Sequence, residues 1–352
     1  MIDKKKWAGS IIFSMMLSTF SLSVHAEEKV NSKDIHNPYI QQYINEQKKF
    51  KVKEGNNALV NPQIEDQIIK ETLHTYYQED LKVANLIHKL TNDKNLKVQT
   101  LSLSKEDKIS VMHKIMEMYV SVKNTEEQKT LYSYLERYAN SSGDKVSITF
   151  LEELTNQQKN ELSNLAIADY NGPAAGDWAY NNYNKYSTNY PKFTGNFGTD
   201  CTNFVSQAMH VGGGKPQAGN WSISKKNSTY WVINSANELN YSWKLSDPSP
   251  WISVKEFSSY WNPKSKVHGM SHDSYRDNHS SVYNRSIYKG DVVVFHKGVA
   301  GWVTVPTHLM IISEFDTTNK DFKLAGHSNE RQAYPLLSAI SDYSYIEILE
   351  IP

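Results

Sequence analysis

The chain has very little cysteine: Cys201 is the single cysteine among 352 residues. An internal disulfide is therefore excluded, and so is a fold stapled by disulfides. The chain also has no excess of charge of either sign, with 38 basic and 38 acidic residues. This balance argues against nucleic acid or an anionic membrane surface as the main partner, because both are bound through clustered Lys and Arg.

Long apolar runs are missing too, apart from one near the start of the chain. Residues 1–26 combine a basic start at Lys4–Lys6 with an apolar, serine-interrupted run that ends in small residues at Ala26, which is the pattern of a cleavable secretory signal. We expect a mature chain that begins near Glu27 and is secreted or associated with the cell wall. An uncleaved membrane anchor is the alternative, but no later stretch approaches the roughly 18 apolar residues of a spanning helix.

Tryptophan is absent from residues 27–165, whereas every tryptophan of the mature chain lies after residue 170. This shift in composition predicts an accessory domain over 27–155 and a catalytic domain over 156–352. The accessory domain shows no catalytic constellation. Its role is open between wall targeting, inhibition of the other half and support of folding.

Apolar residues recur at helical spacing from Ile64 to Tyr76 and from Ile109 to Val120, and predict a mainly helical accessory domain. Short strands are expected at Leu96–Leu103 and Val146–Leu151, where β-branched and apolar residues cluster. Capping boxes, which mark helix starts, are predicted at Ser104 to Asp107, Thr125 to Gln128 and Thr155 to Gln158.

Beyond residue 160 the pattern passes from helices to strands. Helical spacing continues from Leu162 to Tyr170 and from Trp178 to Tyr186. Runs rich in β-branched or aromatic residues then predict strands at Val292–Phe295, His308–Ser313, Phe322–Gly326 and Tyr345–Ile351, with a polar turn at Asp316–Lys320. Helices followed by antiparallel strands predict an α+β fold.

Cys201 precedes a segment in which apolar residues recur at helical spacing as far as Met209, so it is expected at a helix start. The helix dipole, with an imidazolium nearby, lowers the pKa of a thiol from about 8.5 and favours the thiolate, which is the attacking form. We therefore interpret Cys201 as a nucleophile with a low pKa. The alternative is a buried, inert cysteine.

Three motifs occur in order in the second half: Asp200-Cys201-Thr202-x-Phe204-Val205, Lys289-Gly290-Asp291 before a strand, and His308 at the start of another strand. Together they resemble the NlpC/P60 cysteine hydrolases, whose fold is papain-like. The longer form Asp200 to Gln207, followed by Gly212-Gly213, is still more similar to the putative amidase domain family of Gram-positive bacteria. This resemblance spans residues 162–352.

The resemblance implies a papain-like catalytic domain, in which a helix that starts at the nucleophile Cys201 packs on an antiparallel sheet. It also implies that His308 is the base and that His327, on the next strand, orients the imidazole of His308. Asn329 is the alternative for this third role.

The immediate neighbours of Cys201 are expected to support the reaction. The backbone amide of Cys201 at a helix start is suited to stabilise an oxyanion. Gly198 is a candidate for a second group that stabilises the oxyanion. Asp200 cannot donate a hydrogen bond as a carboxylate, so we interpret it as structural support and as a helix cap.

Two departures from the family pattern stand out. Cys201 and His308 are farther apart than in compact NlpC/P60 domains, so residues 214–286 are interpreted as an insertion on the substrate side. Lys289 also replaces the usual proline. The insertion contains five tryptophans, which suit either a large aromatic core or a neutral cleft for peptides: Trp221, Trp231, Trp243, Trp251 and Trp261.

The function predicted from these features is hydrolysis of amide bonds in cell-wall peptide through a thioester. The expected partner is a peptide or a peptidoglycan stem peptide, and the oligomeric state is left open. Acyl transfer of the transglutaminase type would use the same thiolate. A silent secreted binding or toxin module is the other alternative.

No cofactor is expected, because the proposed nucleophile and base are both side chains. A histidine- and carboxylate-rich stretch is the rival candidate for a metal site, but its spacing matches no strong template: His268, His272, Asp273, Asp277 and His279.

Treatment with EDTA is therefore expected to leave turnover unchanged, because no metal takes part in the predicted thiol chemistry. The measurement compares the initial rate of amide cleavage before and after chelation and dialysis. Loss of activity with recovery on adding zinc would contradict the prediction and point to the stretch from His268 to His279.

Overall fold

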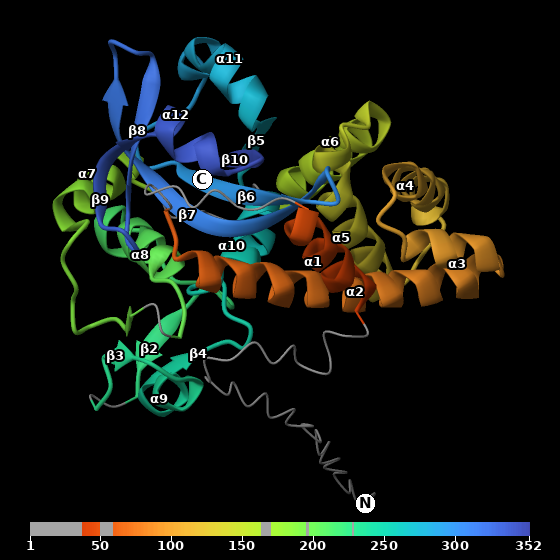
Figure 1. Cartoon of the computed structure of the whole chain (residues 1–352), viewed down its shortest axis with the longest axis horizontal. Helices are drawn as coiled ribbons and strands as arrows, with labels where there is room; N and C mark the ends of the chain where they lie inside the picture. The colour runs from red at the N-terminus through yellow and green to blue at the C-terminus, as the bar shows by residue number, and fades with distance from the viewer. Residues whose placement is uncertain (1–36, 50–58, 163–169, 195–196, 227–228) are drawn as a thin grey trace, which may run out of the picture.

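The computed structural model describes residues 37–49, 59–162, 170–194, 197–226 and 229–352. Figure 1 shows a helical half next to a half built on a curved sheet. The predicted signal over residues 1–26 lies outside the described residues, as does most of the helix expected from Leu162 to Tyr170. Within the described ranges, no helix is both long enough and apolar enough to cross a membrane.

The helices have the following bounds: α1 Pro38–Lys49, α2 Pro62–Thr91, α3 Lys94–Thr100, α4 Lys105–Tyr119, α5 Thr125–Ser142, α6 Lys145–Leu162, α7 Gly172–Asn182, α8 Cys201–Gln207, α9 Ala236–Ser242, α10 Val254–Trp261, α11 His272–Tyr283 and α12 Leu336–Ala339. Three short turns of other helix types are η1 Ala208–Gly212, η2 Asn262–Lys264 and η3 Ile340–Asp342. The strands are β1 Lys192–Phe193, β2 Ile223–Lys225, β3 Val232–Ile233, β4 Trp243–Leu245, β5 Lys266–Ser271, β6 Val292–Val299, β7 Val303–Asp316, β8 Asp321–Gly326, β9 Arg331–Pro335 and β10 Tyr345–Glu350.

The main sheet has six strands in the order β5-β10-β6-β7-β8-β9, and each neighbouring pair is antiparallel. Alternating side chains along each strand point to opposite faces. Val294 and Leu309 pack on one face with α7, α8 and the insertion. Phe295 and Met310 pack on the other face with α11 and α12. The α+β prediction is confirmed.

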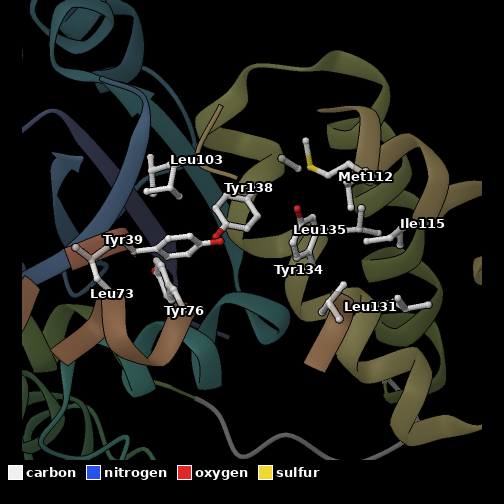
Figure 2. Packing of buried hydrophobic residues seen from close by; sticks show 14 of the residues in the cluster. Tyr39, Leu73, Tyr76, Leu103, Met112, Ile115, Leu131, Tyr134, Leu135 and Tyr138 are labelled. Atoms are coloured by element: carbon white, nitrogen blue, oxygen red, sulfur yellow. The ribbon is translucent and has the colours of Figure 1, made fainter. Parts of the chain in front are cut away.

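The helical half shares its core with the sheet. The hairpin that joins β6 to β7 extends out of the sheet, and its Val299, Val303 and Val305 are buried among side chains of the helical half. The indole of Trp302 donates a hydrogen bond to the Leu103 carbonyl at 3.0 Å. Figure 2 shows part of this core, with side chains from several helices directed toward one another.

A buried ion pair lies inside the helical half. The ammonium of Lys108 is 2.6 Å from a carboxylate oxygen of Asp80, and both side chains are fully buried. Lys108 also donates to the Thr100 carbonyl at 2.7 Å and to the Tyr39 hydroxyl at 2.9 Å, so every proton of the ammonium has an acceptor. These contacts offset the cost of burying the charge.

The long helix α2 connects the two halves. Its 30 residues correspond to roughly 45 Å of helix. Figure 1 shows its N-terminal end beside α8 and the sheet and its C-terminal end among α3 and α5. Asn61 caps the start by accepting from the Gln63 amide, and Pro62 occupies the first helical position, where a missing N–H has no cost.

Local predictions in the helical half had mixed outcomes. The helices expected around Ile64 and Ile109 are confirmed, and Ser104 caps α4 by accepting from the Asp107 amide. The other two capping boxes are wrong, because α5 is capped by Asn124 and Thr155 lies inside α6.

Both strands expected in the helical half are wrong, because residues 96–100 lie in α3 and residues 146–151 lie in α6. Asp93 accepts from the amides of Asn95 and Leu96, and Asp144 accepts from the Ser147 amide at 3.0 Å. These N-terminal carboxylates start helices that the β-branched residues alone did not indicate.

Residue 155 lies within α6, and valines of the β6–β7 hairpin pack in the core of the helical half. A chain that begins at residue 156 would expose three buried valines, at a cost of about 5 kcal/mol in total, which is comparable to a whole domain's stability. We expect it to lose cooperative thermal unfolding, measured by circular dichroism. The control is the chain that begins near residue 27, and a sharp native-like transition in the shorter chain would contradict this.

Candidate active site

Cys201 is the first residue of α8, as predicted, and its side chain is fully buried. The Thr199 hydroxyl lies 3.3 Å from its sulfur and the Thr202 hydroxyl lies 3.8 Å from it. The backbone N–H of Leu309, on β7, also donates to the sulfur. The start of α8 is thus held against the strand that carries His308.

The expected low pKa of this thiol is not what the structure supports. Burial raises the pKa of Cys201, and this effect outweighs the hydrogen bonds from Thr199, the Leu309 backbone and Thr202, which lower it. The nearby Asp200 carboxylate also raises the pKa. Desolvation penalises the thiolate, so burial favours the neutral thiol.

His308 lies on β7 opposite Phe295 of β6, and only 1% of its surface is exposed. Its ring packs on the Phe295 ring with centroids 5.9 Å apart. Burial lowers the pKa of His308 to about 3, with a further contribution from the positive charge of Lys297. Among the described residues, its Nδ1 has no hydrogen-bond partner.

The start of α8 therefore lies against β7, but the His308 ring packs on Phe295, whose core lies on the sheet face opposite to the one where Leu309 packs with α8. Among the described residues, no hydrogen bond joins the sulfur to the imidazole, and the side chains bonded to the sulfur are those of Thr199 and Thr202. Burial raises the pKa of Cys201 and lowers the pKa of His308, so it favours the neutral form of both groups.

His327 has partners other than His308. Its Nδ1 lies 2.6 Å from an Asp200 carboxylate oxygen, and its Nε2 lies 3.3 Å from the Asn182 carbonyl. Both ring nitrogens are thus occupied at the end of β8. The alternative residue, Asn329, is exposed in the turn that follows.

Asp200 is structural support, but not as a helix cap. Its side chain makes no capping bond to α8. It accepts instead from the Phe193 amide and the Asn203 side chain, both at 3.0 Å, and contacts His327. The carboxylate links β1, α8 and β8.

Polar residues on one face of α8 also make buried contacts, and these were not predicted from the sequence. Asn203 donates to the Pro191 carbonyl at 2.7 Å and accepts from the Trp251 indole at 3.1 Å. Ser206 accepts from the Trp221 indole at 3.0 Å. The spacing of Asp200, Asn203 and Ser206, three residues apart, was the available signal.

The motif Lys289-Gly290-Asp291 is also structural. Gly290 has a φ of 94°, and a Cβ there would lie 2.1 Å from the Gly172 carbonyl oxygen, so only glycine fits. Asp291 accepts from the Tyr288 amide at 2.7 Å. These contacts hold the start of β6 against α7.

The tryptophans of the insertion mostly belong to the core. The four most buried have exposed fractions of 3% or less: Trp221, Trp243, Trp251 and Trp261. They pack with α8 on the face of the sheet to which Val294 and Leu309 point. The predicted neutral aromatic cleft is therefore not formed by these side chains.

The rival metal stretch is divided between two elements. His268 lies on β5 and bonds Glu350, whereas His272 and Asp273 begin α11, where Asp273 pairs with Arg276. Across the part of the chain that the structure describes, no three His, Cys, Asp or Glu side chains group in a way that could hold a metal ion.

A groove of about 350 Å³ lies next to the segment that precedes the candidate nucleophile. Gly198 and Thr199 line it on one side, and residues of α2 line the other side. Gly198, proposed from the sequence to help stabilise an oxyanion, is therefore a wall residue of this groove.

Comparison with known proteins gives one match. The family model described as "putative amidase domain" matches residues 169–348. No curated protein and no solved structure matches the chain.

Iodoacetamide should label Cys201 with a pH midpoint above the value of about 8.5 for a free cysteine, because a raised pKa leaves less thiolate at any pH below it. Labelling of the unliganded protein is followed by mass spectrometry, with glutathione as reference. The variant Cys201→Ala, which has no thiol, gives the background. A midpoint near neutral pH would restore the expectation of an acidic thiol.

Proposed function

This chain belongs to the putative amidase domain family, and on that premise we propose that it is a secreted, cysteine-dependent amidase that cleaves amide bonds in cell-wall peptide. The family match supports amide hydrolysis. The cysteine mechanism, the secretion and the substrate are parts of the proposal.

One observation carries the mechanism: the sulfur of Cys201, at the start of α8, accepts a hydrogen bond from the residue directly after His308. The candidate nucleophile therefore lies against the strand that carries the candidate base, although the two residues lie far apart in sequence. The unpartnered Nδ1 of His308 is a suitable proton acceptor, and its low pKa keeps the ring unprotonated at neutral pH.

The proposed reaction begins when the sulfur attacks the carbonyl carbon of the amide and its proton passes to His308. The imidazolium then gives this proton to the leaving amine as the C–N bond breaks, which leaves a thioester on Cys201. Water, deprotonated by His308, hydrolyses the thioester and restores the thiol. Backbone amides of the first turn of α8 are suited to bind the oxyanion.

The arrangement of elements supports a papain-like interpretation, since a helix that starts at the cysteine packs on an antiparallel sheet that carries the histidine. His327 would act within this scheme through Asp200, which holds the segment in front of Cys201. We propose a positioning role for the pair His327 and Asp200.

The proposed substrate depends on the predicted secretory signal and on the family resemblance. Export favours a substrate outside the cell, and the peptide part of peptidoglycan offers amide bonds there.

The test is incubation of the mature protein with purified peptidoglycan and, separately, with casein, followed by mass spectrometry of released muropeptides and new amino termini. We expect muropeptides from the wild type and a loss of about 1,000-fold or more in Cys201→Ala, because the nucleophile is removed. His308→Ala should lose activity similarly, whereas the matched change His279→Ala on α11 should not.

Cleavage of casein alone would replace the wall substrate with a general peptidase activity. Wild-type activity in Cys201→Ala would overturn the cysteine mechanism. Release of an amide-exchanged product when an amine is added would move the proposal to acyl transfer.

A further inference from the structure

The helical half forms one side of the groove that Gly198 and Thr199 line. Ile64, Ile68 and Glu71, on successive turns of α2, face Phe193 and the segment that carries Thr199. The Thr199 hydroxyl is 3.3 Å from the sulfur of Cys201. A chain bound in this groove would therefore touch α2 as it approached the nucleophile.

This wall is anchored beside the candidate base. Glu65, in the first turn of α2, accepts from the Thr307 hydroxyl at 2.9 Å and lies 3.1 Å from the ammonium of Lys297. Thr307 directly precedes His308. The Glu65 side chain is only 12% exposed, so these bonds are shielded from water and hold α2 at a defined position against β7.

Among the described residues that line the groove, the carboxylate of Glu71 has no salt bridge to a cation. Lys255 is the only cationic residue among the described residues that line it, and its ammonium lies 3.0 Å from Glu256 and 3.2 Å from Glu79. Glu71 is exposed and is bonded to the side-chain amide of Gln67 at 2.9 Å. A negative charge in a groove with apolar walls favours a cationic ligand group.

The position of Glu71 along α2 sets a distance from the reaction. Six residues separate it from Glu65, which corresponds to roughly 9 Å of helix. An extended peptide advances roughly 3.3 Å per residue. A cationic group held by Glu71 would thus lie about three residues along an extended peptide from the level of Glu65, which bonds the residue before His308.

We propose that α2 of the helical half forms one wall of the substrate groove. In this groove, Glu71 binds a primary ammonium on the substrate peptide, about three residues from the scissile amide. This inference rests on the proposed function for its scissile bond. The ligand class is a peptide with an apolar residue between Ile68 and Phe193 and a lysine-like side chain beyond it.

The test uses fluorescein-labelled, alanine-rich heptapeptides that carry one lysine at successive positions, each with a counterpart in which the lysine is Nε-acetylated. Binding to the full mature chain with Cys201→Ala is measured by fluorescence anisotropy. At the best lysine position we expect the lysine peptide to bind about fivefold more tightly than its acetylated counterpart. This ratio should fall as salt is raised.

In Cys201→Ala combined with Glu71→Gln, the ratio should fall close to one, and with Glu71→Lys it should invert. The matched control is Glu126→Gln, whose side chain is 81% exposed on α5 away from the groove and which should keep the full ratio. An unchanged ratio in Glu71→Gln, or no preference for lysine at any position, would overturn the inference.

Cleavage of the same peptides by the wild type separates this inference from the proposed function. If peptides bind through Glu71 but are never cleaved, the result would support the role of the groove in binding. It would also remove the proposal that the protein hydrolyses amides in peptides. If the peptides are cleaved, and neither their affinity nor their rate of cleavage changes when Glu71 is substituted, only this inference would be removed.

Discussion

The pairing of β7 with β6 is the constraint on which both halves of the molecule depend. β7 has 14 residues, and its beginning and its middle serve different cores. Val303 and Val305 are buried in the helical half, whereas Leu309 and Ile311 pack beneath α8. Because one continuous strand crosses from one core to the other, its register sets the position of the helical half and of Cys201 together.

Burial has a chemical consequence at this strand. The Cys201 thiol and the His308 imidazole are both nearly inaccessible, and burial favours the neutral form of each. A thiolate and an imidazolium would have to be created in apolar surroundings without solvation. In such a site, charge separation is more favourable when the developing oxyanion meets fixed amide donors, which need no reorganisation.

The buried carboxylate of Asp200 illustrates how the polar residues around Cys201 are used. A charge that is 2% exposed is costly unless it is bonded, and here the Phe193 amide, the Asn203 side chain and His327 share it. Asn203 extends these contacts to Trp251 of the insertion. Most conspicuous polar residues of the motif thus hold the scaffold around Cys201, while the sulfur itself makes longer contacts, at 3.3 and 3.8 Å.

The sequence by itself determined those features whose signals lie within a few residues. Periodicity placed the helices around Ile64 and Ile109 and the helix start at Cys201, and runs of β-branched residues placed β6, β7, β8 and β10. The strand predictions were wrong at residues 96–103 and 146–151. There the β-branched residues indicate strands, whereas Asp93 and Asp144 start helices.

Only the tertiary structure decided the rest, because it depends on contacts between distant residues. The raised pKa of Cys201 follows from burial by several elements, and the partner of His327 is Asp200, 127 residues away. Glu65 meets Thr307 across 242 residues. No local pattern encodes such a meeting, since it arises when two separate elements bury their apolar faces against the same strand and the polar groups between them must find partners.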